Sequence, residues 1–507
     1  MKKIVFLILC LCKAYGEENS SDDGYWFRNT EFQKSLDEKT HSRGHSGNQV
    51  KLYVNGENSL KQRLANLANA DVILIKAYEF WNDISSNEIL DVLIDRTKQG
   101  AKVFIQFDVK GTFSGIKPDS EADLREGRLN PIPDYLQKFL QKSEGNGFVI
   151  PTTVPYSLLS TGSWVLKDHE KSFITWERKN QVNPVRVILG GMNIGDMYLL
   201  GGVKDKNGNF ETVSYYQSEG FSGYSTLPMR DTDVEVIGTV TEDIVARYID
   251  AAEFQLKNPN VYFQKEQAPH IQLALKELRL IQQDMLQNHA LAFPENVGHA
   301  LVRFIYKTAK EFGSREISNI QNFFISMLKQ VPDHSTIQFA TGYFLPTKLL
   351  WKAISEATHR GVIFDILSNR PQGPESAIAS IALPARSQIR HYLKIVPSGS
   401  INFYEWFGNP LEGIGVVMHQ KVYSFGLGEN QPCAIGSANL NTMSLYWDSE
   451  DLLVIQEPDF KKQLDEMLRK DFTSPNSEKI TMEQLKNESF LHQIKEFLIN
   501  KFARDFL

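Results

Sequence analysis

The feature that most constrains the fold is a block of secondary-structure signals that occurs twice in the 507 residues. In the first copy, a β-rich run at 71–80 is followed by a helical pattern at 87–99 and a second β-rich run at 101–108. The second copy has the same order at 335–345, 348–359 and 362–368. Because strand, helix and strand are joined by short connections, each copy predicts a parallel pair of strands. The sequence therefore predicts two α/β halves related by internal duplication.

Each copy also carries a histidine and a lysine two residues apart, followed by a turn of small residues that contains an asparagine. These are His169, Lys171 and Asn193 in the first copy and His419, Lys421 and Asn439 in the second. Acidic residues come later, Asp231 and Asp233 after the first and Asp448 and Glu450 after the second. A single His-x-Lys pair would indicate only a strand histidine beside a surface lysine. Two His-x-Lys pairs, each followed by an asparagine-containing turn and then acidic residues, favour a shared function.

These residue types suit the transfer of a phosphodiester. An imidazole can attack phosphorus and form a covalent intermediate, which splits one difficult displacement into two easier ones. A second imidazole can protonate the leaving oxygen and then deprotonate the incoming water or alcohol. Two lysine ammonium groups and two asparagine amides can hold the non-bridging oxygens as their charge grows. A carboxylate behind each ring can fix its tautomer and stabilise the imidazolium.

The stretches around these residues resemble the phospholipase D superfamily, and within it the bacterial cardiolipin synthase and phospholipase D branch. The similar stretches are 190–196, 230–234, 340–346 and 435–440, with Ser444 and Glu450 downstream of the last. The resemblance covers roughly residues 50–468, most of the chain. One departure concerns the family pattern His-x-Lys-x-x-x-x-Asp, because Trp176 and Gly426 stand where the family has aspartate. In the family that aspartate usually has a structural or supporting role.

The resemblance implies two halves, each a mixed, mostly parallel sheet flanked by helices, with one active site at their interface. It implies that His169 is the nucleophile and His419 the general acid/base, whereas the sequence alone leaves open which is which. The groups implied to bind phosphoryl oxygens are Lys171, Lys421, Asn193 and Asn439. The carboxylates implied to orient the imidazoles are Asp231 and Glu450, with Asp233 a second candidate for the place of Asp231.

We therefore expect an exported phosphodiester-transfer enzyme that acts on glycerophospholipids, by hydrolysis or by phosphatidyl transfer. Its partners would be a phospholipid and a membrane surface that it binds peripherally, and one chain would suffice as a monomer because it contains both halves. No cofactor or metal is expected, because the sequence has no His/Cys/Asp cluster with metal-ligand spacing and no phosphate-binding Gly-x-x-x-x-Gly-Lys-Ser/Thr loop.

Two alternatives stay open. The first is a nuclease of the same superfamily, although a net charge of −6 gives no basic signal for nucleic-acid binding. Affinity for nucleic acid that falls steeply with salt would identify it. The second is a catalytically impaired binding protein, suggested by Trp176 and Gly426. Retention of both histidines, both lysines and both asparagines argues against the second.

The organisation expected along the chain begins with a secretory signal peptide at 1–16, because two lysines precede a short apolar run and a polar exit. A flexible lead-in follows at 17–48, in which His41 and His45 are expected to be solvated. The remaining segments are the first half at 49–255, a helical bridge at 256–315, the second half at 316–472 and a helical tail at 473–507. Long loops at 112–162 and 200–228 are expected to shape the substrate site.

Overall fold

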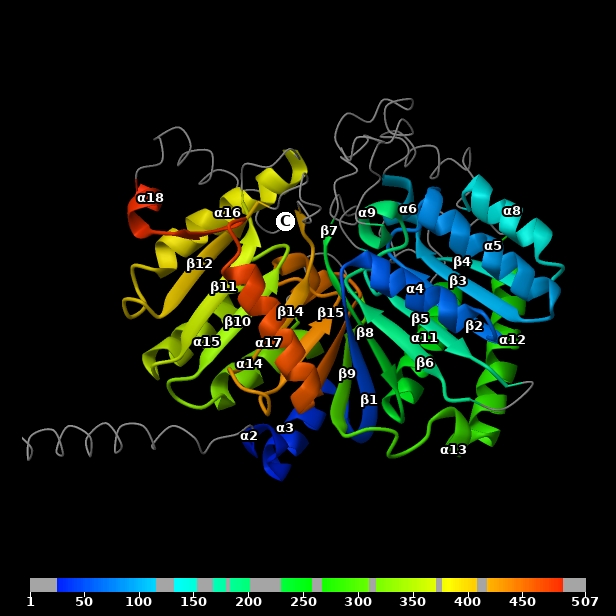
Figure 1. Cartoon of the computed structure of the whole chain (residues 1–507), viewed down its shortest axis with the longest axis horizontal. Helices are drawn as coiled ribbons and strands as arrows, with labels where there is room; N and C mark the ends of the chain where they lie inside the picture. The colour runs from blue at the N-terminus through cyan, green and yellow to red at the C-terminus, as the bar shows by residue number, and fades with distance from the viewer. Residues whose placement is uncertain are drawn as a thin grey trace, which may run out of the picture.

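The computed structural model describes residues 25–114, 132–152, 167–178, 183–200, 229–257, 267–309, 316–370, 376–407 and 417–486. Within these ranges, the main sheet has 15 strands and carries helices on both faces (Figure 1). The antiparallel pair of β1 (Gly44–Val54) and β9 (Ala300–Lys307) lies at its centre and joins the two halves (Figure 1). This arrangement confirms the predicted α/β fold with duplicated halves.

The strands on the two sides of this central pair follow the same order. Outward from β1 come β8 (Thr232–Ile237), β6 (Arg186–Gly190), β5 (Ser172–Trp176), β2 (Val72–Ala77), β3 (Lys102–Asp108) and β4 (Gly147–Thr152). Outward from β9 come β16 (Glu450–Gln456), β15 (Cys433–Gly436), β14 (Lys421–Ser424), β10 (Thr336–Thr341), β11 (Ile363–Asn369), β12 (Ile401–Trp406) and β17 (Ser477–Ile480). The pairs β2–β3 and β10–β11 are parallel, as the sequence predicts.

Helices bury both faces of each half in apolar cores. In the first half these are α4 (Gly56–Leu67), α5 (Ile84–Lys98) and α8 (Asp134–Lys142) on one face and α11 (Val240–Lys257) and α12 (Gln267–Gln287) on the other. In the second half they are α14 (Asn319–Gln330), α15 (Lys348–His359) and α16 (Ser376–Tyr392) on one face and α17 (Pro458–Phe472) on the other. Strands covered on both sides must be apolar throughout, which explains the near-continuous apolar runs in the sequence.

The helices α5 and α15 show why the strand–helix–strand unit recurs. Asp83 begins α5 through a capping box with Ser86, and the Thr347 side chain caps α15. Each helix is followed by a glycine at positive φ, Gly100 at 85° and Gly361 at 82°. Because this left-handed conformation favours glycine and ends a helix, both helices stop at equivalent places before the next strand.

The expected flexible lead-in at 17–48 is wrong for the part that is described. It contains α2 (Tyr25–Arg28), α3 (Thr30–Thr40) and the start of β1. Phe32 and Leu36 of α3 pack into the core of the second half. His45, expected to be solvated, is buried, and its Nε2 lies 2.8 Å from Oδ2 of Asp243. The sequence misled because α3 has only a narrow apolar face within a polar segment.

The helical bridge at 256–315 and the helical tail at 473–507 also need correction. The central strand β9 lies inside the bridge, between α12 and α14. In the tail, β17 pairs antiparallel with β12 and is followed by α18 (Met482–Lys486). In both segments a short β run lies beside a longer helical pattern, and the short run is the weaker signal in the sequence.

Some expectations concern residues outside the described ranges. They are the signal peptide at 1–16, the rest of the two long loops and the end of the tail. The described part of the first loop contains α8 and the sheet strand β4, so the expectation of a loop is wrong there. Among the described helices, none has both the length and the apolar character needed to cross a bilayer.

Candidate active site

Both histidines lie where the two halves meet, and the backbone of the opposite half holds each of them. The His169 amide donates to the Ser449 carbonyl (3.0 Å), and the His419 amide donates to the Arg230 carbonyl (2.9 Å). The second contact adjoins a parallel pair of short strands, β7 (Met229–Arg230) and β13 (Val417–Met418). Since β5 begins directly after Lys171 and β14 begins at Lys421, two equivalent strands deliver both His-x-Lys pairs to this junction.

Each imidazole contacts a carboxylate that belongs to the other half. Nδ1 of His169 lies 3.0 Å from Oε2 of Glu450, and Nδ1 of His419 lies 2.6 Å from Oδ2 of Asp231. Burial, followed by the charge of Asp448, raises the pKa of Glu450 to about 8. A carboxylate at Nδ1 orients the ring and directs Nε2 toward substrate. Neither half holds a complete site.

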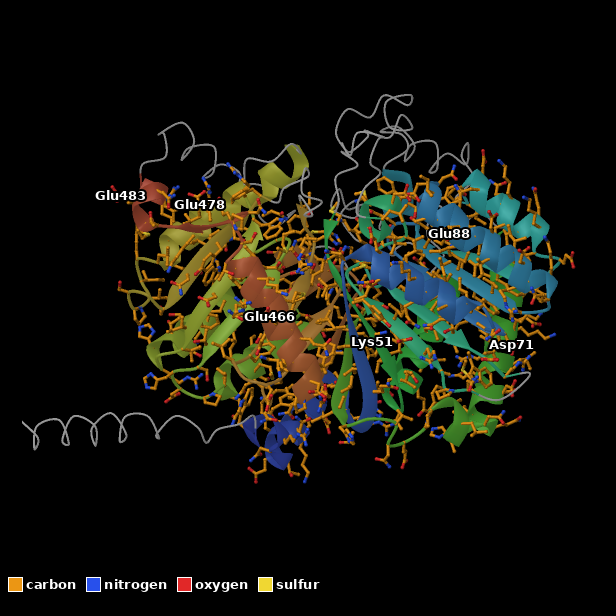
Figure 2. All side chains as sticks on the ribbon, viewed as in Figure 1. Lys51, Asp71, Glu88, Glu466, Glu478 and Glu483 are labelled. Atoms are coloured by element: carbon orange, nitrogen blue, oxygen red, sulfur yellow. The ribbon has the colours of Figure 1, made fainter. Side chains whose placement is uncertain are left out.

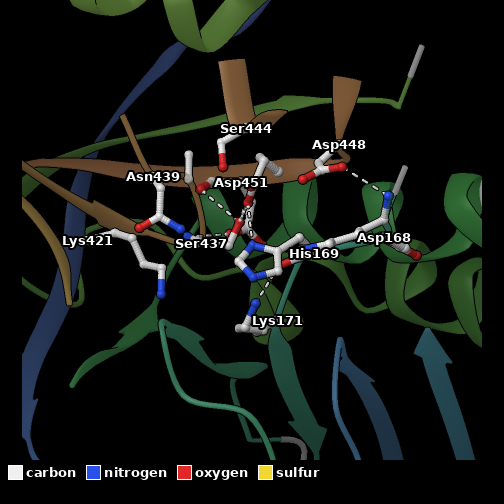
Figure 3. Close-up of polar contacts among 12 residues, drawn as sticks. Asp168, His169, Lys171, Lys421, Ser437, Asn439, Ser444, Asp448 and Asp451 are labelled. Atoms are coloured by element: carbon white, nitrogen blue, oxygen red, sulfur yellow. Dashed lines mark hydrogen bonds and ion pairs between the residues drawn. The ribbon is translucent and has the colours of Figure 1, made fainter. Parts of the chain in front are cut away.

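The groups predicted to bind phosphoryl oxygens surround the histidines. Nζ of Lys171 donates to the His169 carbonyl (2.7 Å), and Nζ of Lys421 donates to the His419 carbonyl (2.5 Å). Figure 3 shows the Lys171 ammonium directly below His169 and the Lys421 side chain to the left of the ring, with Asn439 near Lys421. Asn193 is buried on the side of the first half. The structure therefore brings the eight predicted site residues into one buried cluster.

Burial and the lysines favour the neutral form of both imidazoles. The pKa of His169 lies well below its usual range, first because of burial and then because of Lys171 and Lys421. Burial, followed by Lys421, lowers the pKa of His419 to about 4, although Asp231 acts in the opposite direction. The neutral imidazole is the form that attacks phosphorus. A bound phosphodiester anion raises both pKa values because it stabilises the imidazolium.

Asp233, the second candidate for the place of Asp231, does not serve a histidine. Its Oδ2 accepts hydrogen bonds from Oγ of Ser59 (2.6 Å) and Nη2 of Arg63 (2.9 Å) in α4. Asp231 lies in the break between β7 and β8, whereas Asp233 lies within β8. The two carboxylates therefore do not share one strand face, and Asp233 instead ties α4 to the sheet.

The two positions that depart from the family pattern lie at the far ends of the strands that carry Lys171 and Lys421. Trp176 ends β5 in the apolar core, roughly 17 Å along the strand from Lys171. Gly426 follows β14 at a φ of 141°, where a Cβ would lie 2.8 Å from Gln431. Its carbonyl accepts from Nζ of the buried Lys461 (2.9 Å). Both positions serve packing and turn formation in their own half.

The chain is similar to known proteins over most of its length. Residues 325–472 match the family model described as "Cardiolipin synthase, PLD-like domain". Cardiolipin synthase A of Pseudomonas syringae pv. syringae (strain B728a) is 22% identical over 453 residues, which is 89% of this chain and 73% of that protein. An uncharacterized protein of Helicobacter pylori (strain J99) is 23% identical over 414 residues, 77% of this chain and 72% of that protein. The solved structure of phosphatidylserine synthase from Haemophilus influenzae Rd KW20 has a TM-score of 0.60 at 14% identity and covers 94% of this chain and 100% of that one.

The chain carries a PLD-like domain at 325–472 and resembles the phospholipase D superfamily over most of its length. Its similarity is to the cardiolipin synthase-like branch, and these relatives indicate a phospholipase D-like enzyme. The fold likeness and the sequence relatives agree with the resemblance that the His-x-Lys stretches indicate.

Three residues of this phospholipase D-like site were missed in the sequence. The Tyr78 ring lies 4.9 Å from that of His169, and the Tyr198 ring lies 5.1 Å from that of His419, both edge to face. The third residue, Glu79, is buried directly after Tyr78 in the chain, and its Oε2 accepts a hydrogen bond from the Tyr198 hydroxyl (2.8 Å). The available signal was a glutamate near the end of the β-rich run 71–80, because a charge in a buried run is rarely present without a function or a partner.

A pH dependence follows from the buried Lys421. Burial lowers its pKa to about 7, with Lys171 acting in the same direction and Asp231, Glu450 and Glu79 opposing it. A lowered pKa means that the ammonium is present below about pH 7 and is lost above it. We expect kcat/KM to fall about tenfold per pH unit above that point, because it reports the free enzyme.

The matched variant for this pH test is Lys421→Arg, which stays protonated at every pH examined. Its absolute rate is expected to be lower because a guanidinium has another shape, but its alkaline decline should move to higher pH. Measurement of kcat/KM between about pH 5 and 9 compares the two proteins. An alkaline decline at the same pH in both would assign it to another group.

Proposed function

We propose that the chain is an exported enzyme that transfers the phosphatidyl group of a glycerophospholipid to water or an alcohol through a phosphohistidine at His169. The coarser part, phosphodiester cleavage or phosphatidyl transfer on phospholipids, is supported by the cardiolipin synthase relatives. The observation that carries the mechanism is the pair of imidazoles in one buried site, each bound at Nδ1 to a carboxylate of the other half.

In the first step, Nε2 of His169 attacks phosphorus, and the bond from phosphorus to the leaving alcohol oxygen breaks. The binding of the anionic phosphodiester promotes protonation of His419, which donates its proton to that oxygen. Lys171 and Lys421 stabilise the charge that builds on the non-bridging oxygens, because their ammonium groups are fixed in place before the reaction. The product of this step is a phosphatidyl group bound to His169 and a free alcohol.

In the second step, water or an alcohol takes the place of the leaving group. His419 accepts its proton, the oxygen attacks phosphorus, and the bond between phosphorus and Nε2 of His169 breaks. Glu450 and Asp231 hold the two rings in place through both steps. Water yields phosphatidic acid, and an alcohol yields a new phosphodiester.

The proposed export and the proposed lipid substrate have different support. Export rests on the sequence of residues 1–16, with its lysine pair, short apolar run and polar exit. Sequencing of the N-terminus of the secreted protein tests it. The lipid substrate rests on the relatives and on a net charge of −6, which offers no general attraction to nucleic acid. Both halves lie in one chain, so we expect the monomer to act.

The test of this function uses vesicles of phosphatidylcholine or phosphatidylglycerol with a labelled phosphatidyl group, in the presence of EDTA. We expect phosphatidic acid without added alcohol and a phosphatidyl-alcohol when 1-butanol is present. The double variant His169→Ala/His419→Ala is the blank, because it lacks both imidazoles but keeps the buried lysines.

Two results would contradict the proposed function. Absence of lipid products together with cleavage of single-stranded DNA or RNA would identify a nuclease with the same active site. Absence of any product from lipid or nucleic acid would identify a binding protein that has kept the fold.

A further inference from the structure

Glu79 is a further carboxylate at a site that is proposed to bind a phosphodiester anion. Its side chain is only 9% exposed. The Tyr198 hydroxyl donates to its Oε2 (2.8 Å), and Nδ2 of Asn193 lies 3.4 Å from the same oxygen. The Glu79 amide in turn donates to Oδ1 of Asn193 (3.2 Å). Backbone and side chain together therefore hold Glu79 against one of the groups predicted to bind phosphate.

Glu79 is also linked to both histidines through neighbouring tyrosines. It follows Tyr78, whose ring meets His169, and it accepts from Tyr198, whose ring meets His419. His419 is the group that exchanges a proton with the leaving or entering alcohol in the proposed mechanism. The Tyr198–Glu79 pair therefore borders the side of the site at which the alcohol oxygen is handled.

The transfer of phosphate itself does not require this carboxylate. Parallel bridges pair Phe80 with Ile194 in the first half and Phe344 with Leu440 in the second. Glu79 precedes Phe80, so its equivalent in the second half is Tyr343, which precedes Phe344. At this position one half has a carboxylate and the other half a tyrosine. The carboxyl oxygens of Glu79 accept hydrogen bonds, so this position suits a hydrogen-bond donor better than a phosphoryl oxygen.

We propose that Glu79, held by Tyr198, binds a second hydrogen-bond donor on the leaving or entering alcohol. This inference rests on the proposed function and deepens it. The enzyme should prefer short alcohols with a hydroxyl or amino group next to the reacting oxygen, such as a glycerol or ethanolamine moiety. One donor group pairs with the Glu79 carboxylate while the reacting hydroxyl meets His419. A simple alkyl alcohol has no such donor, so Glu79 keeps only its contacts with Tyr198 and Asn193 and the alcohol binds less tightly.

The test is a competition between two alcohols in one reaction, because the product ratio does not depend on how much enzyme is active. Labelled phosphatidylcholine vesicles are incubated with equal concentrations of glycerol and 1-propanol, or of ethanolamine and 1-propanol. For the wild type we expect about tenfold or more product from glycerol and from ethanolamine than from propanol, as for a hydrogen bond to a charged group. In Glu79→Leu, which has no acceptor, both ratios should fall toward one.

A second variant, Glu79→Gln, separates the two kinds of donor and preserves the shape of the side chain. Its amide oxygen still accepts from a hydroxyl, so the glycerol ratio should persist in part. It has no charge to pair with an ammonium, so the ethanolamine ratio should fall about tenfold. The matched control is Glu88→Gln on the exposed surface of α5, which is labelled in Figure 2 and should keep both ratios.

The possible outcomes distinguish this proposal from the function on which it rests. If both Glu79 variants turn over lipid with the wild-type ratios, the alcohol site is wrong and the proposed function stands. Equal ratios of about one in the wild type would also overturn the alcohol site. If the wild type forms neither phosphatidic acid nor a phosphatidyl-alcohol, the proposed function fails and this inference fails with it.

Discussion

Replacement of His169 by alanine is expected to abolish covalent labelling of the protein and to lower lipid turnover by roughly 10⁴-fold. Without its imidazole no phosphorus–nitrogen bond can form, and water cannot reach the same alignment. The readout is acid-labile radioactivity on the denatured protein after a rapid quench with a phosphatidyl-labelled lipid. Lipid products are measured in the same samples.

The companion variant His419→Ala should behave differently. It keeps the nucleophile but lacks the proton donor of the first step and the proton acceptor of the second, so turnover of an ordinary lipid should fall by about the same factor. A phosphatidyl-labelled diester of p-nitrophenol should restore the first step, because its leaving oxygen needs no proton, and labelled protein should then accumulate. Label retained in His169→Ala and lost in His419→Ala would show that His419 is the nucleophile and His169 the general acid/base.

Replacement of either carboxylate that contacts a histidine of the other half is expected to cost about 10²–10⁴-fold in kcat/KM with little change in fold. In Asp231→Asn the amide lies 2.6 Å from Nδ1 of His419 in place of an acceptor, and it then favours the wrong tautomer. In Glu450→Gln the same change affects His169, at 3.0 Å. Steady-state kinetics and thermal melting of each variant are the measurements.

The control for these carboxylates is Asp233→Asn, which alters an acid two residues from Asp231 that binds Ser59 and Arg63. We expect it to lower the melting temperature, because Arg63 is buried and loses its charged partner. Its kcat/KM per folded molecule should stay close to that of the wild type. A loss of activity in Asp233→Asn equal to that in Asp231→Asn would show that the contact between a carboxylate and a histidine of the other half is not the cause of the loss.

The sequence predicted the duplicated α/β halves and the residues that gather in the site, because both leave local patterns. His169 and Lys171 lie two residues apart just before a run of β-forming residues, and a turn with an asparagine follows that run in both halves. Pairing across the halves leaves no such pattern. That Glu450 serves His169 depends on how β16 and β5 are brought together, and the same holds for Asp231 and His419.

Other features were hidden because tertiary packing decides them. Phe32 and Leu36 form a short apolar stripe in a polar segment, and only contact with the core of the second half gives it meaning. The strand β9 follows a long helical pattern, yet it pairs with β1 at the centre of the sheet. Glu79 looks like one surface charge until Tyr198 is brought to it from a distant stretch of chain.

Fusion of the two halves allows each side of the site to evolve separately. A homodimer built from one half would repeat every residue across its two-fold axis, so a new side chain beside one histidine would also arise beside the other. Here Glu79 has a tyrosine, Tyr343, as its counterpart. Mutations in the first half can therefore retune which alcohols are accepted, while the second half continues to supply an unchanged proton-transfer partner. Divergence of selectivity within this lineage should accordingly be concentrated on one side of the pseudo-symmetry axis.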